Sequence, residues 1–503
     1  MATSYMTPGV YIVEKNAFPG SAVAVATAVP VFVGYTQKAE RNGKSLLHVP
    51  TRITSFAEYV ENFGGGFKPR FKIAEADPTK KQETFTINTK KYTVDINAGH
   101  KALFYNCMRL FYANGGSNCY VMSIGTYGDK PDGFTIALED YMGNDTKPNV
   151  FEILKKEFEP TLVVLPDAIA MDSVEDCYSL YGNVLTHAAN TQSRFGIFDV
   201  AYQSPSEKMD DVIKLFRDKI GINELNYGAA YYPWLKTSIV QASEIDFQNL
   251  DVSVDLSALL PEDKAKAVVA AWVALTDDKK DDAAKTNYHQ SLKASSPTYV
   301  AVLEEIRARL NELPPSAAMA GLYTFIDNSR GVWKAPANAS LSMVNSPLVN
   351  VSSEEQQNLN VDVLGGKSIN VIRTFPGIGT LVWGARTLDG NSQDWRYVNV
   401  RRTLIMIEQS LKLATRSYVF EPNNVSTWVT VSSMINNFLY NLWNQGALAG
   451  AVPAQAYNVQ IGLGSTMTPT DILDGIMRIN VGVAIVRPAE FIIITFQQKQ
   501  QES

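Results

Sequence analysis

Apolar positions in the first half of the chain form short continuous runs that alternate with segments of helical period. Residues 23–35 (VAVATAVPVFVGY) are apolar at odd and even positions alike, which is typical of a strand buried on both faces. Further strands are predicted at 118–124, 161–165, 194–200 and 227–232, with helices at 172–190 and 205–220. This alternation of strands and helices predicts a mainly parallel sheet in an α/β layer.

Two helices and two insertions complete this half. Ser55 and Glu58 form a capping box, and Gly64 ends the predicted helix over 55–63. An amphipathic helix is predicted over 100–113. The polar residues 68–99 are interpreted as an inserted hairpin with one strand at 84–96, the acidic residues 241–285 as a solvated surface insertion, and 298–312 as a helix.

The pattern changes after about residue 360. Helices are predicted at 400–417 and 427–444, the second with Gly446 near its C-terminal end. Strands are predicted at 369–374, 379–384, 457–463, 477–486 and 490–497. This segment is predicted to be an independent α+β unit, so the whole chain belongs to a multidomain α/β and α+β class.

Charge and length exclude several classes of partner. The chain of 503 residues has 45 basic and 51 acidic side chains, so no basic excess indicates nucleic-acid binding. The longest apolar stretch, at 22–35, is too short to span a bilayer and contains Pro30, so no direct membrane insertion is expected. The N-terminus has no secretory signal, which favours synthesis in the cytoplasm.

Candidate chemistry is sparse. The three cysteines have no CxxC spacing and the four histidines are widely separated, which argues against disulfides and metal sites. No complete phosphate loop, dinucleotide fingerprint or GxSxG motif occurs, so neither a cofactor nor a catalytic residue is predicted. This favours a structural role.

Both ends of the chain have the composition of strands. One is Val10 to Val13, separated from the body by the loop AFPGS, and the other is Phe491 to Phe496 (FIIITF). An exposed strand is an aggregation hazard unless its backbone is paired. The pattern alone leaves two alternatives open: both ends fold back into their own core, or they add to sheets of neighbouring subunits.

Several ordered blocks resemble a known family. They are YMTPGVYIVEK with AVPVFVGYT near the start, the segment at 55–65, LFYANGGSNCYV, PPSAAMAGLYTFIDNSRGVWKAPAN at 314–338, INVIRTFPGIGTLVWGARTL, WRYVNVRRTLIMIEQS, FLYNLWNQGALAG and RPAEFIIITFQQ at 487–498. In these blocks the chain is similar to the contractile tail sheath proteins of phage tails, R-type pyocins and extracellular contractile injection systems. Residues 67–99 and 125–300 match loosely or not at all, apart from PTLVVLPDAI.

The resemblance implies a domain order and an exchange of strands. It predicts an N-terminal arm and linker at 1–22, an N-terminal part of the sheath at 23–100, an outer α/β domain at 101–345, and a C-terminal sheath core domain at 346–503. Both arms would join core-domain sheets of neighbouring copies. Carried onto this chain, the exchanging residues are Val10, Tyr11, Ile12 and Val13, the receiving residues Val481, Val483 and Ile485, and the C-terminal arm residues Phe491, Ile492, Ile493, Ile494 and Phe496.

The resemblance also implies partners. The chain would form a helical homopolymer of hexameric rings around an inner tube protein, with baseplate and cap or terminator proteins at its ends. Contraction would drive the tube through a target membrane. The short helix at 470–478 is interpreted either as the tube contact, through Thr470, Asp471, Asp474 and Arg478, or as a buried turn.

Some expectations remain alternatives. The locally basic block at 369–420 suits a contact between subunits, and Arg401 with Arg402 is interpreted as forming salt bridges within the fold or to a neighbour. The AFPGS loop and the Arg487-Pro488-Ala489 turn are predicted joints. A hydrolase that uses the α/β domain, or a sheath-related cap or terminator that forms single rings, are the competing functions. Assembly is expected in the cytoplasm, with the finished particle in some cases released.

Overall fold

The computed structural model describes residues 22–128 and 133–493, which fall into two compact units. Of these residues, 22–25 and 406–486 form unit 1, and the remainder, including 487–493, form unit 2. The chain therefore passes between the units at 25/26, within the helix α13 (Val398–Thr415), and at 486/487. The multidomain α/β and α+β class predicted from the sequence is confirmed.

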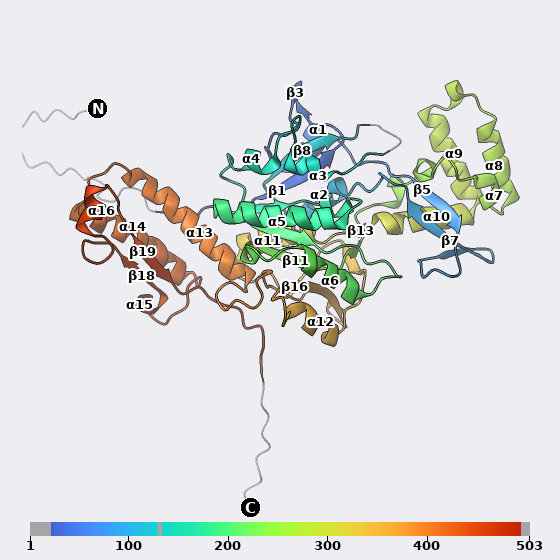
Figure 1. Ribbon diagram of the computed structural model, residues 1–503. Coiled ribbons are helices and arrows are strands. Elements are labelled where there is room, and N and C mark those ends of the chain that lie inside the picture. Colours follow the sequence, from blue (N-terminus) through green and yellow to red (C-terminus); the bar gives the residue numbers. More distant parts are fainter. Residues whose placement is uncertain (1–21, 129–132, 494–503) are drawn as a thin grey trace, which may run out of the picture. The chain divides into compact units, whose positions relative to one another are not determined.

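A nine-stranded sheet forms the centre of unit 2 (Figure 1). Its order is β14-β17-β16-β11-β10-β9-β1-β8-β4. The strands are β14 (Ala339–Ser340), β17 (Gly379–Val382), β16 (Ile369–Phe375), β11 (Gly228–Tyr232), β10 (Phe195–Asp199), β9 (Leu162–Val164), β1 (Pro30–Thr36), β8 (Cys119–Thr126) and β4 (Thr51–Ile53). The six strands from β16 to β8 pair in parallel, and antiparallel strands close both edges. The predicted parallel sheet is thus present.

Alternate residues of the central strands enter two separate cores, because successive side chains of a strand point to opposite faces. Val31 and Val33 lie in the first core, while Phe32 lies in the second. The first core is covered by α3 (Leu138–Met142), α4 (Val150–Leu154), α5 (Val174–Thr191), α6 (Met209–Lys219) and α12 (Ser353–Asn360). The second is covered by α1 (Phe56–Phe63), α2 (Phe104–Ala113) and α11 (Ser316–Arg330).

Two helices of the second face begin at buried carboxyl groups located at the end of β10 (Asp199) or just after β9 (Asp167). Asp167 accepts hydrogen bonds from the amides of Leu103 and Phe104, each at 2.9 Å, at the start of α2. Asp199 accepts from the amide and hydroxyl of Ser316, at 2.7 and 2.5 Å, at the start of α11. Burial raises the pKa of Asp167 to about 6 and that of Asp199 to about 7, against the opposing effect of these hydrogen bonds.

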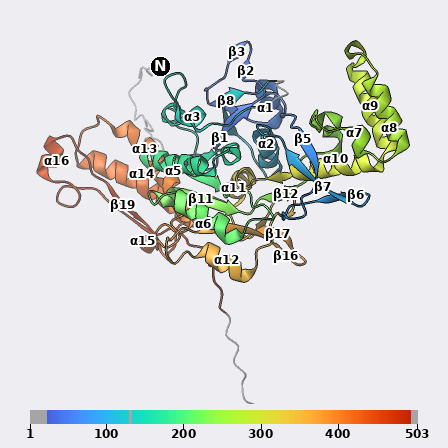
Figure 2. The same cartoon turned by 45° about the vertical axis from the view of Figure 1, so that its right-hand side comes forward.

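A third core lies in an insertion on unit 2 (Figure 2). The sheet β5-β7-β6 contributes β5 (Phe71–Glu75), β6 (Phe85–Ile87) and β7 (Lys90–Ile96), and the helices are α7 (Leu256–Leu259), α8 (Asp263–Val273), α9 (Asp282–Ser295) and α10 (Pro297–Leu310). Smaller strands are β2 (Glu40–Arg41), β3 (Lys44–Ser45), β12 (Leu235–Thr237), β13 (Glu312–Leu313) and β15 (Val344–Pro347). Leu260, Val269 and Leu292 are buried here. The expectation of a merely solvated surface at 241–285 was wrong, because these apolar residues form a core with the hairpin.

Several predicted boundaries need correction. The strand predicted over 23–35 begins only at Pro30, because the backbone amides of Val25 and Val29 bond to side-chain hydroxyls instead of a strand. The single strand predicted at 84–96 is two strands, since Asn88 takes a left-handed conformation with φ of 54°. The helices predicted at 55–63 and 427–444 are confirmed as α1 and α14 (Val425–Asn444).

The predicted independent unit after residue 360 was also wrong in part. β16 and β17 belong to the nine-stranded sheet, because Ala230 to Tyr232 of β11 pair with Ile369 to Val371. Such pairing joins residues about 140 positions apart, which no local pattern specifies. The division of the chain at residues 22, 100 and 345 stays a prediction.

Candidate inter-subunit interface

Unit 1 is built on the apolar face of α14. Its buried residues recur at three- and four-residue spacing, which places them on one side of the helix: Val431, Met434, Ile435, Phe438, Leu439 and Leu442. Asn424 caps the N-terminus by accepting a hydrogen bond from the Thr427 amide at 3.2 Å. Gly446 follows the helix with φ of 83°, as expected for a residue that ends it.

A two-stranded antiparallel sheet packs beside this helix. It consists of β18 (Tyr457–Gln460), which contacts α14, and β19 (Asn480–Val483), with α15 (Pro453–Ala456) directly before β18. Tyr457 pairs with Val483, and Val459 with Val481. Because paired residues share a face, these four half-buried side chains form one apolar surface, and the polar residues of both strands occupy the other.

Each strand of this sheet has a single neighbour. Among the residues that the structure describes, β18 pairs only with β19, and β19 only with β18. Each strand therefore keeps one unpaired edge of amide and carbonyl groups, which is a template for a further strand. The predicted receiving residues Val481 and Val483 lie in β19, and Ile485 follows it in a bridge to Leu448. A receiving role for these edges stays a prediction.

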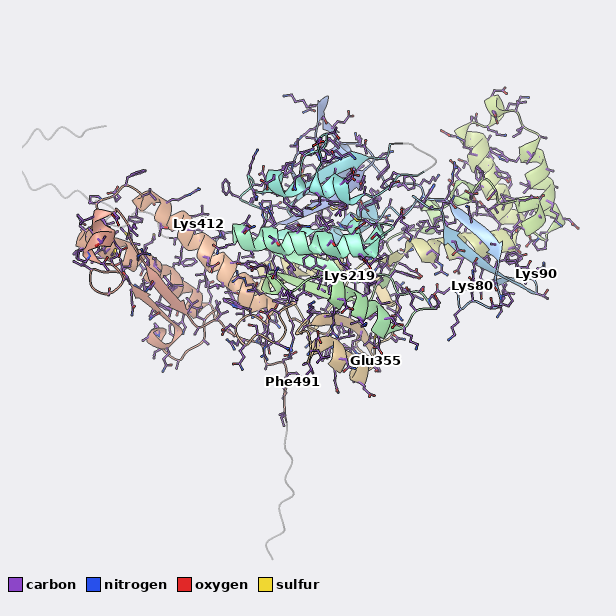
Figure 3. The ribbon with its side chains drawn as sticks, viewed as in Figure 1. Lys80, Lys90, Lys219, Glu355, Lys412 and Phe491 are labelled. Atoms are coloured by element: carbon purple, nitrogen blue, oxygen red, sulfur yellow. The ribbon has the colours of Figure 1, made fainter. Side chains whose placement is uncertain are left out.

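The C-terminal segment leaves unit 1 after Val486 and is attached to unit 2 at Glu490. Burial opposes ionisation of Glu490, but hydrogen bonds from Arg386 and Asn360 outweigh it and hold the pKa of this carboxyl below its ordinary value. Phe491, Ile492 and Ile493 then follow with exposed fractions of 70%, 79% and 89% (Figure 3). They form no strand in this monomer, and Ile494 and Phe496 lie outside the described residues.

The first described residues are attached in a similar way. The Thr27 hydroxyl donates to Asp327 at 2.6 Å, and the Thr27 carbonyl accepts from Arg402 at 3.1 Å. Arg402 and Asp327 form a salt bridge of 2.5 Å, and both side chains are 3% exposed. The predicted arm residues Val10, Tyr11, Ile12 and Val13 lie outside the described residues, as does the AFPGS loop.

The predicted tube-contact segment is shorter than expected. The helix α16 (Pro469–Leu473) ends there because Asp474 caps it and Gly475 has φ of 70°. Asp471 and Arg478 bind each other at 2.9 Å, and hydrogen bonds from Thr468 hold the pKa of Asp471 at about 2. Thr470 and Asp474 are exposed, so the segment is not a buried turn.

Several arginines of the basic block at 369–420 bind partners within unit 2. Arg386 pairs with Glu490, and Arg402 pairs with Asp327. The Arg401 guanidinium lies between the rings of Tyr227 and Trp395, 4.0 and 4.9 Å from their centroids. The expected salt bridge within the fold is correct for Arg402. These three arginines are buried, so they are not available for a contact between subunits.

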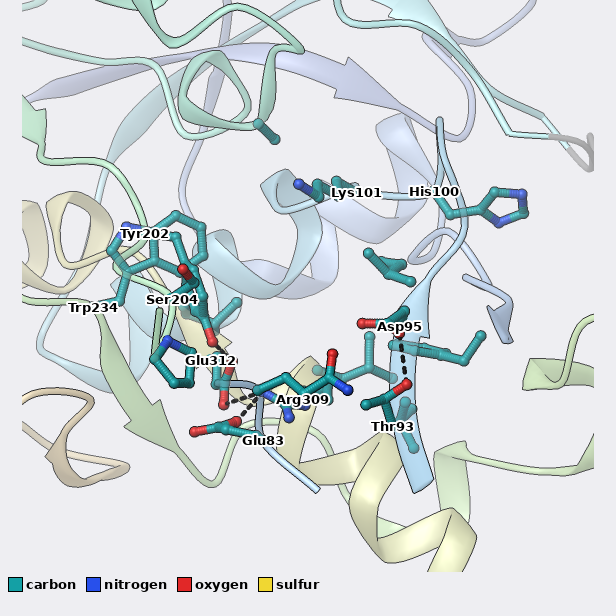
Figure 4. Close-up of a pocket in the computed structure, with 18 of the residues that line it drawn as sticks. Glu83, Thr93, Asp95, His100, Lys101, Tyr202, Ser204, Trp234, Arg309 and Glu312 are labelled. Atoms are coloured by element: carbon teal, nitrogen blue, oxygen red, sulfur yellow. Dashed lines mark hydrogen bonds and ion pairs between the residues drawn. The ribbon is translucent and has the colours of Figure 1, made fainter. Parts of the chain in front are cut away.

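A cavity lies elsewhere, between the insertion and the sheet of unit 2 (Figure 4). It measures about 780 Å³. Arg309 binds Glu83 and lies 3.6 Å from Glu312, which also accepts a hydrogen bond from Tyr202 at 3.0 Å. Ser204 in this cavity donates to Glu207 at 2.7 Å. Most of these polar groups pair with one another, while the buried Nε of Arg309 has no hydrogen-bond partner among the described residues.

In residues 22–128 and 133–493, no group of three or more histidine, cysteine or acidic side chains could hold a metal ion. No helix of that same part is both long and apolar enough to cross a bilayer.

Sequence reasoning missed the residues that hold the two ends of the chain. Glu490 stands directly before the apolar run FIIITF, and this change from charge to apolar residues is the one local signal for it. The partners Arg386 and Asn360 are more than 100 positions away. Only the tertiary structure brings them together.

Comparisons with known proteins agree with this architecture. Residues 391–499 match the family model of the phage tail sheath C-terminal domain. A tail sheath protein of Vibrio phage KVP40 is 23% identical over 32% of this chain. The match spans about a quarter of that relative's own length (23%).

Two solved structures match over nearly the whole chain. The sheath of the extracellular contractile injection system PVC, in the contracted state, is 29% identical with a TM-score of 0.60, covering 99% of both chains. The helical sheath of the anti-feeding prophage in the contracted state is 29% identical with a TM-score of 0.60, covering 99% of this chain and 100% of the other. In its C-terminal domain and in its whole-chain fold, this chain is therefore similar to contractile tail sheath proteins.

Proposed function

We propose that the chain is the structural subunit of a contractile sheath, which polymerises helically around an inner tube and contracts to drive that tube through a target membrane. The similarity to sheath proteins supports the general role, since the similar structures are sheaths of injection systems. The observation that carries the proposal is a complementary pair of features in one chain: an incomplete sheet in unit 1 and an exposed apolar segment at 491–493.

Strand addition satisfies both features at once. An incoming segment pairs its backbone with an open edge of the β18–β19 sheet, and each hydrogen bond contributes about 0.5–1.5 kcal/mol net. The same addition removes Phe491, Ile492 and Ile493 from water, at roughly 25 cal/mol per Å² of apolar surface. A segment of six residues can therefore stabilise a junction by several kcal/mol.

The two open edges suit two arms. The C-terminal arm, from Phe491 to Phe496, takes one edge of a neighbouring copy, and the N-terminal arm, from Val10 to Val13, takes the other. An arm that passes to the next copy forms a head-to-tail contact, which repeats without closing and so builds a helix. The chain passes between the units at three points, and the two that lie outside a helix, at 25/26 and 486/487, allow the copies to change orientation while the strands stay paired.

Further partners follow from the proposal. The inner tube protein contacts the segment around α16, where Thr470 and Asp474 are exposed. The Asp471–Arg478 ion pair restrains the conformation of this loop. Baseplate and terminator proteins bind the open edges at the two ends of the polymer. Assembly takes place in the cytoplasm, and the particle is later released.

Electron microscopy of truncated chains tests the function. The full chain, co-expressed with its inner tube protein, is expected to form long sheaths by negative staining. Removal of residues 1–16, or of 491–503, should leave a folded monomer and abolish long sheaths, because each deletion removes one exchanged strand. The matched control removes only the polar residues 498–503 and should assemble normally.

The outcomes separate the alternatives. Single rings from the full chain would identify a cap or terminator instead of a sheath. Long sheaths formed by either strand deletion would contradict strand exchange by that arm. A full chain that forms no polymer with any tube protein of its own gene cluster would overturn the proposed function.

A further inference from the structure

Glu490 binds the end of the chain to unit 2 through a buried network. Arg386 donates from Nε to Oε1 at 2.9 Å and from Nη2 to Oε2 at 2.7 Å. Tyr397 donates its hydroxyl to Oε2 at 2.9 Å, and the Asn360 amide donates to Oε1 at 2.8 Å. The Arg386 side chain is only 4% exposed. Both carboxylate oxygens are therefore held by charged and neutral donors from three separate segments.

Arg386 is itself fixed to the central sheet. Its amide donates to Asn370 Oδ1 at 2.7 Å, and its carbonyl accepts from Asn370 Nδ2 at 2.7 Å. Asn370 lies in β16 and also donates to the carbonyl of Ala230 in the neighbouring strand β11 at 3.2 Å. A continuous set of hydrogen bonds thus runs from two strands of the nine-stranded sheet to the root of the C-terminal segment.

The residues on either side of Glu490 are held weakly. Arg487 lies 3.7 Å from Asp394, and both side chains are more than half exposed, so this pair contributes little. Phe491 and the two residues after it are exposed. Before Glu490, the nearest backbone hydrogen bond to unit 1 is that of the Val486 amide to Ala447, at 3.2 Å. Glu490 is therefore the last firm attachment before the exposed apolar run.

We propose that Glu490 is a positioning residue for strand exchange, which fixes the starting point of the C-terminal arm on unit 2 so that movement of unit 2 is transmitted to the neighbouring copy. This inference rests on the proposed sheath function. The exchanged strand begins at the residue directly after the anchor, so the bound arm has almost no slack.

The cost of losing the anchor follows from the length of the tether. Without Glu490, the nearest attachment is Val486, and four additional residues add up to about 14 Å of reach. The effective concentration of a tethered group falls with about the −3/2 power of the tether length. Lengthening the free tether from one residue to five therefore lowers it by roughly tenfold. An arm on the longer tether still binds, but it holds its neighbour less tightly. It also transmits no force to that neighbour until the tether is fully extended.

The test compares Glu490→Ala with Glu354→Ala, an exposed glutamate elsewhere in unit 2. Sheaths of the Glu490→Ala variant are expected to form, to release monomer in dilute urea roughly tenfold faster than wild type, and to contract over only part of their length. In the monomer, hydrogen exchange of a peptide covering 487–493 should also be faster. Glu354→Ala should match wild type in each measurement.

Glu490→Ala leaves the buried Arg386 without its partner, which can cause misfolding. A second variant therefore keeps the test decisive. The double variant Arg386→Met with Glu490→Gln removes the ion pair without leaving an unpaired charge, and it should show the same faster release. Rescue by Glu490→Asp, which restores the carboxylate, is expected to be partial. A merely structural role would lower the melting temperature of the monomer and leave release from assembled sheaths unchanged.

The results distinguish the positioning role of Glu490 from the sheath function on which it rests. If wild-type sheaths form and both anchor variants release monomer and contract as wild type does, the positioning role of Glu490 is wrong while the sheath function stands. If wild type itself forms no sheaths, the proposed function fails.

Discussion

The nine-stranded sheet of unit 2 and the two-stranded sheet of unit 1 differ in how their edges are closed. In unit 2, six parallel strands are covered on both faces, and the edges are closed by β14 and β4, which have only two and three residues. Unit 1 has a two-stranded sheet of four residues per strand, with one open edge on each strand among the described residues. The nine-stranded sheet of unit 2 is thus protected against further pairing at its edges, whereas the sheet of unit 1 offers templates for it. This contrast agrees with the proposed division, in which unit 2 is stable by itself and unit 1 takes part in assembly.

Buried charge follows the same division. Within the described part of the chain, the buried charged side chains all belong to unit 2, among them Arg194, Asp199, Arg386 and Arg402. A buried charge needs a fixed partner, so these residues require a complete and rigid surrounding structure. Unit 1 relies on the apolar face of α14. Substitutions in the two units should therefore differ in size and in the transition that they affect.

The largest expected effect is from breaking the buried pair at the root of the N-terminal segment. Asp327→Ala leaves the Arg402 guanidinium buried without its carboxylate and removes the hydrogen bond from Thr27. The free energy of unfolding of unit 2 should fall by about 3–5 kcal/mol, measured by urea denaturation of the monomer. The control, Glu75→Ala, breaks an exposed pair with Lys90 and should lower the free energy of unfolding far less. Equal effects of the two substitutions would contradict the special role of buried charge in unit 2.

A smaller effect, which depends on pH, is expected at Asp199. Its pKa is raised by burial to about 7, above its ordinary value, so the folded state favours the protonated carboxyl. The contribution of protonated Asp199 to the stability of the folded state is fully present below about pH 4 and is lost as the pH rises towards 7. Asp199→Asn keeps an acceptor for the Ser316 amide and cannot ionise. The melting temperature of wild type should therefore fall relative to this variant between pH 4 and 7.

The control for this pH dependence removes a surface charge. Asp145 is exposed, and Asp145→Asn should follow wild type across the whole range. Asp167, whose pKa is also raised, titrates in the wild type and in both variants, so its contribution cancels in the difference. A constant difference in melting temperature between wild type and Asp199→Asn would show that Asp199 stays ionised throughout.

The sequence predicted local elements far better than it predicted their grouping. Runs such as TLVVL and RFGIFDV, and the cap at Ser55, specify β9, β10 and α1 because their signals lie within a few residues. The pairing of β16 with β11 depends on strands about 140 positions apart, so the local pattern assigned β16 to a separate unit. The exchanging strands were suggested by composition. The anchors at Thr27 and Glu490 were not, because their partners are remote in sequence.

The smallest expected effect compares one helix cap in each unit. Asn424 caps α14 in unit 1, and Ser173 caps α5 in unit 2 by accepting a hydrogen bond from the Asp176 amide, also at 3.2 Å. Replacing either residue by alanine should cost about 1 kcal/mol, because each leaves one amide at a helix start without its partner. A given loss of free energy lowers the melting temperature more in a small unit, by about 4–8 °C for 60–100 residues and by less than about 4 °C for larger ones.

Scanning calorimetry of the monomer measures both caps in the same way. Asn424→Ala should lower a first transition, assigned to unit 1, by about 4–8 °C and leave the later transition in place. Ser173→Ala should move only the later transition, and by the smaller amount. If the monomer melts in one transition that both substitutions shift equally, the units do not unfold independently, and unit 1 does not gain its stability from assembly. Two separate transitions would instead show that unit 1 unfolds by itself, and strand addition in the sheath is then expected to raise the first transition, since binding to the folded state alone stabilises it.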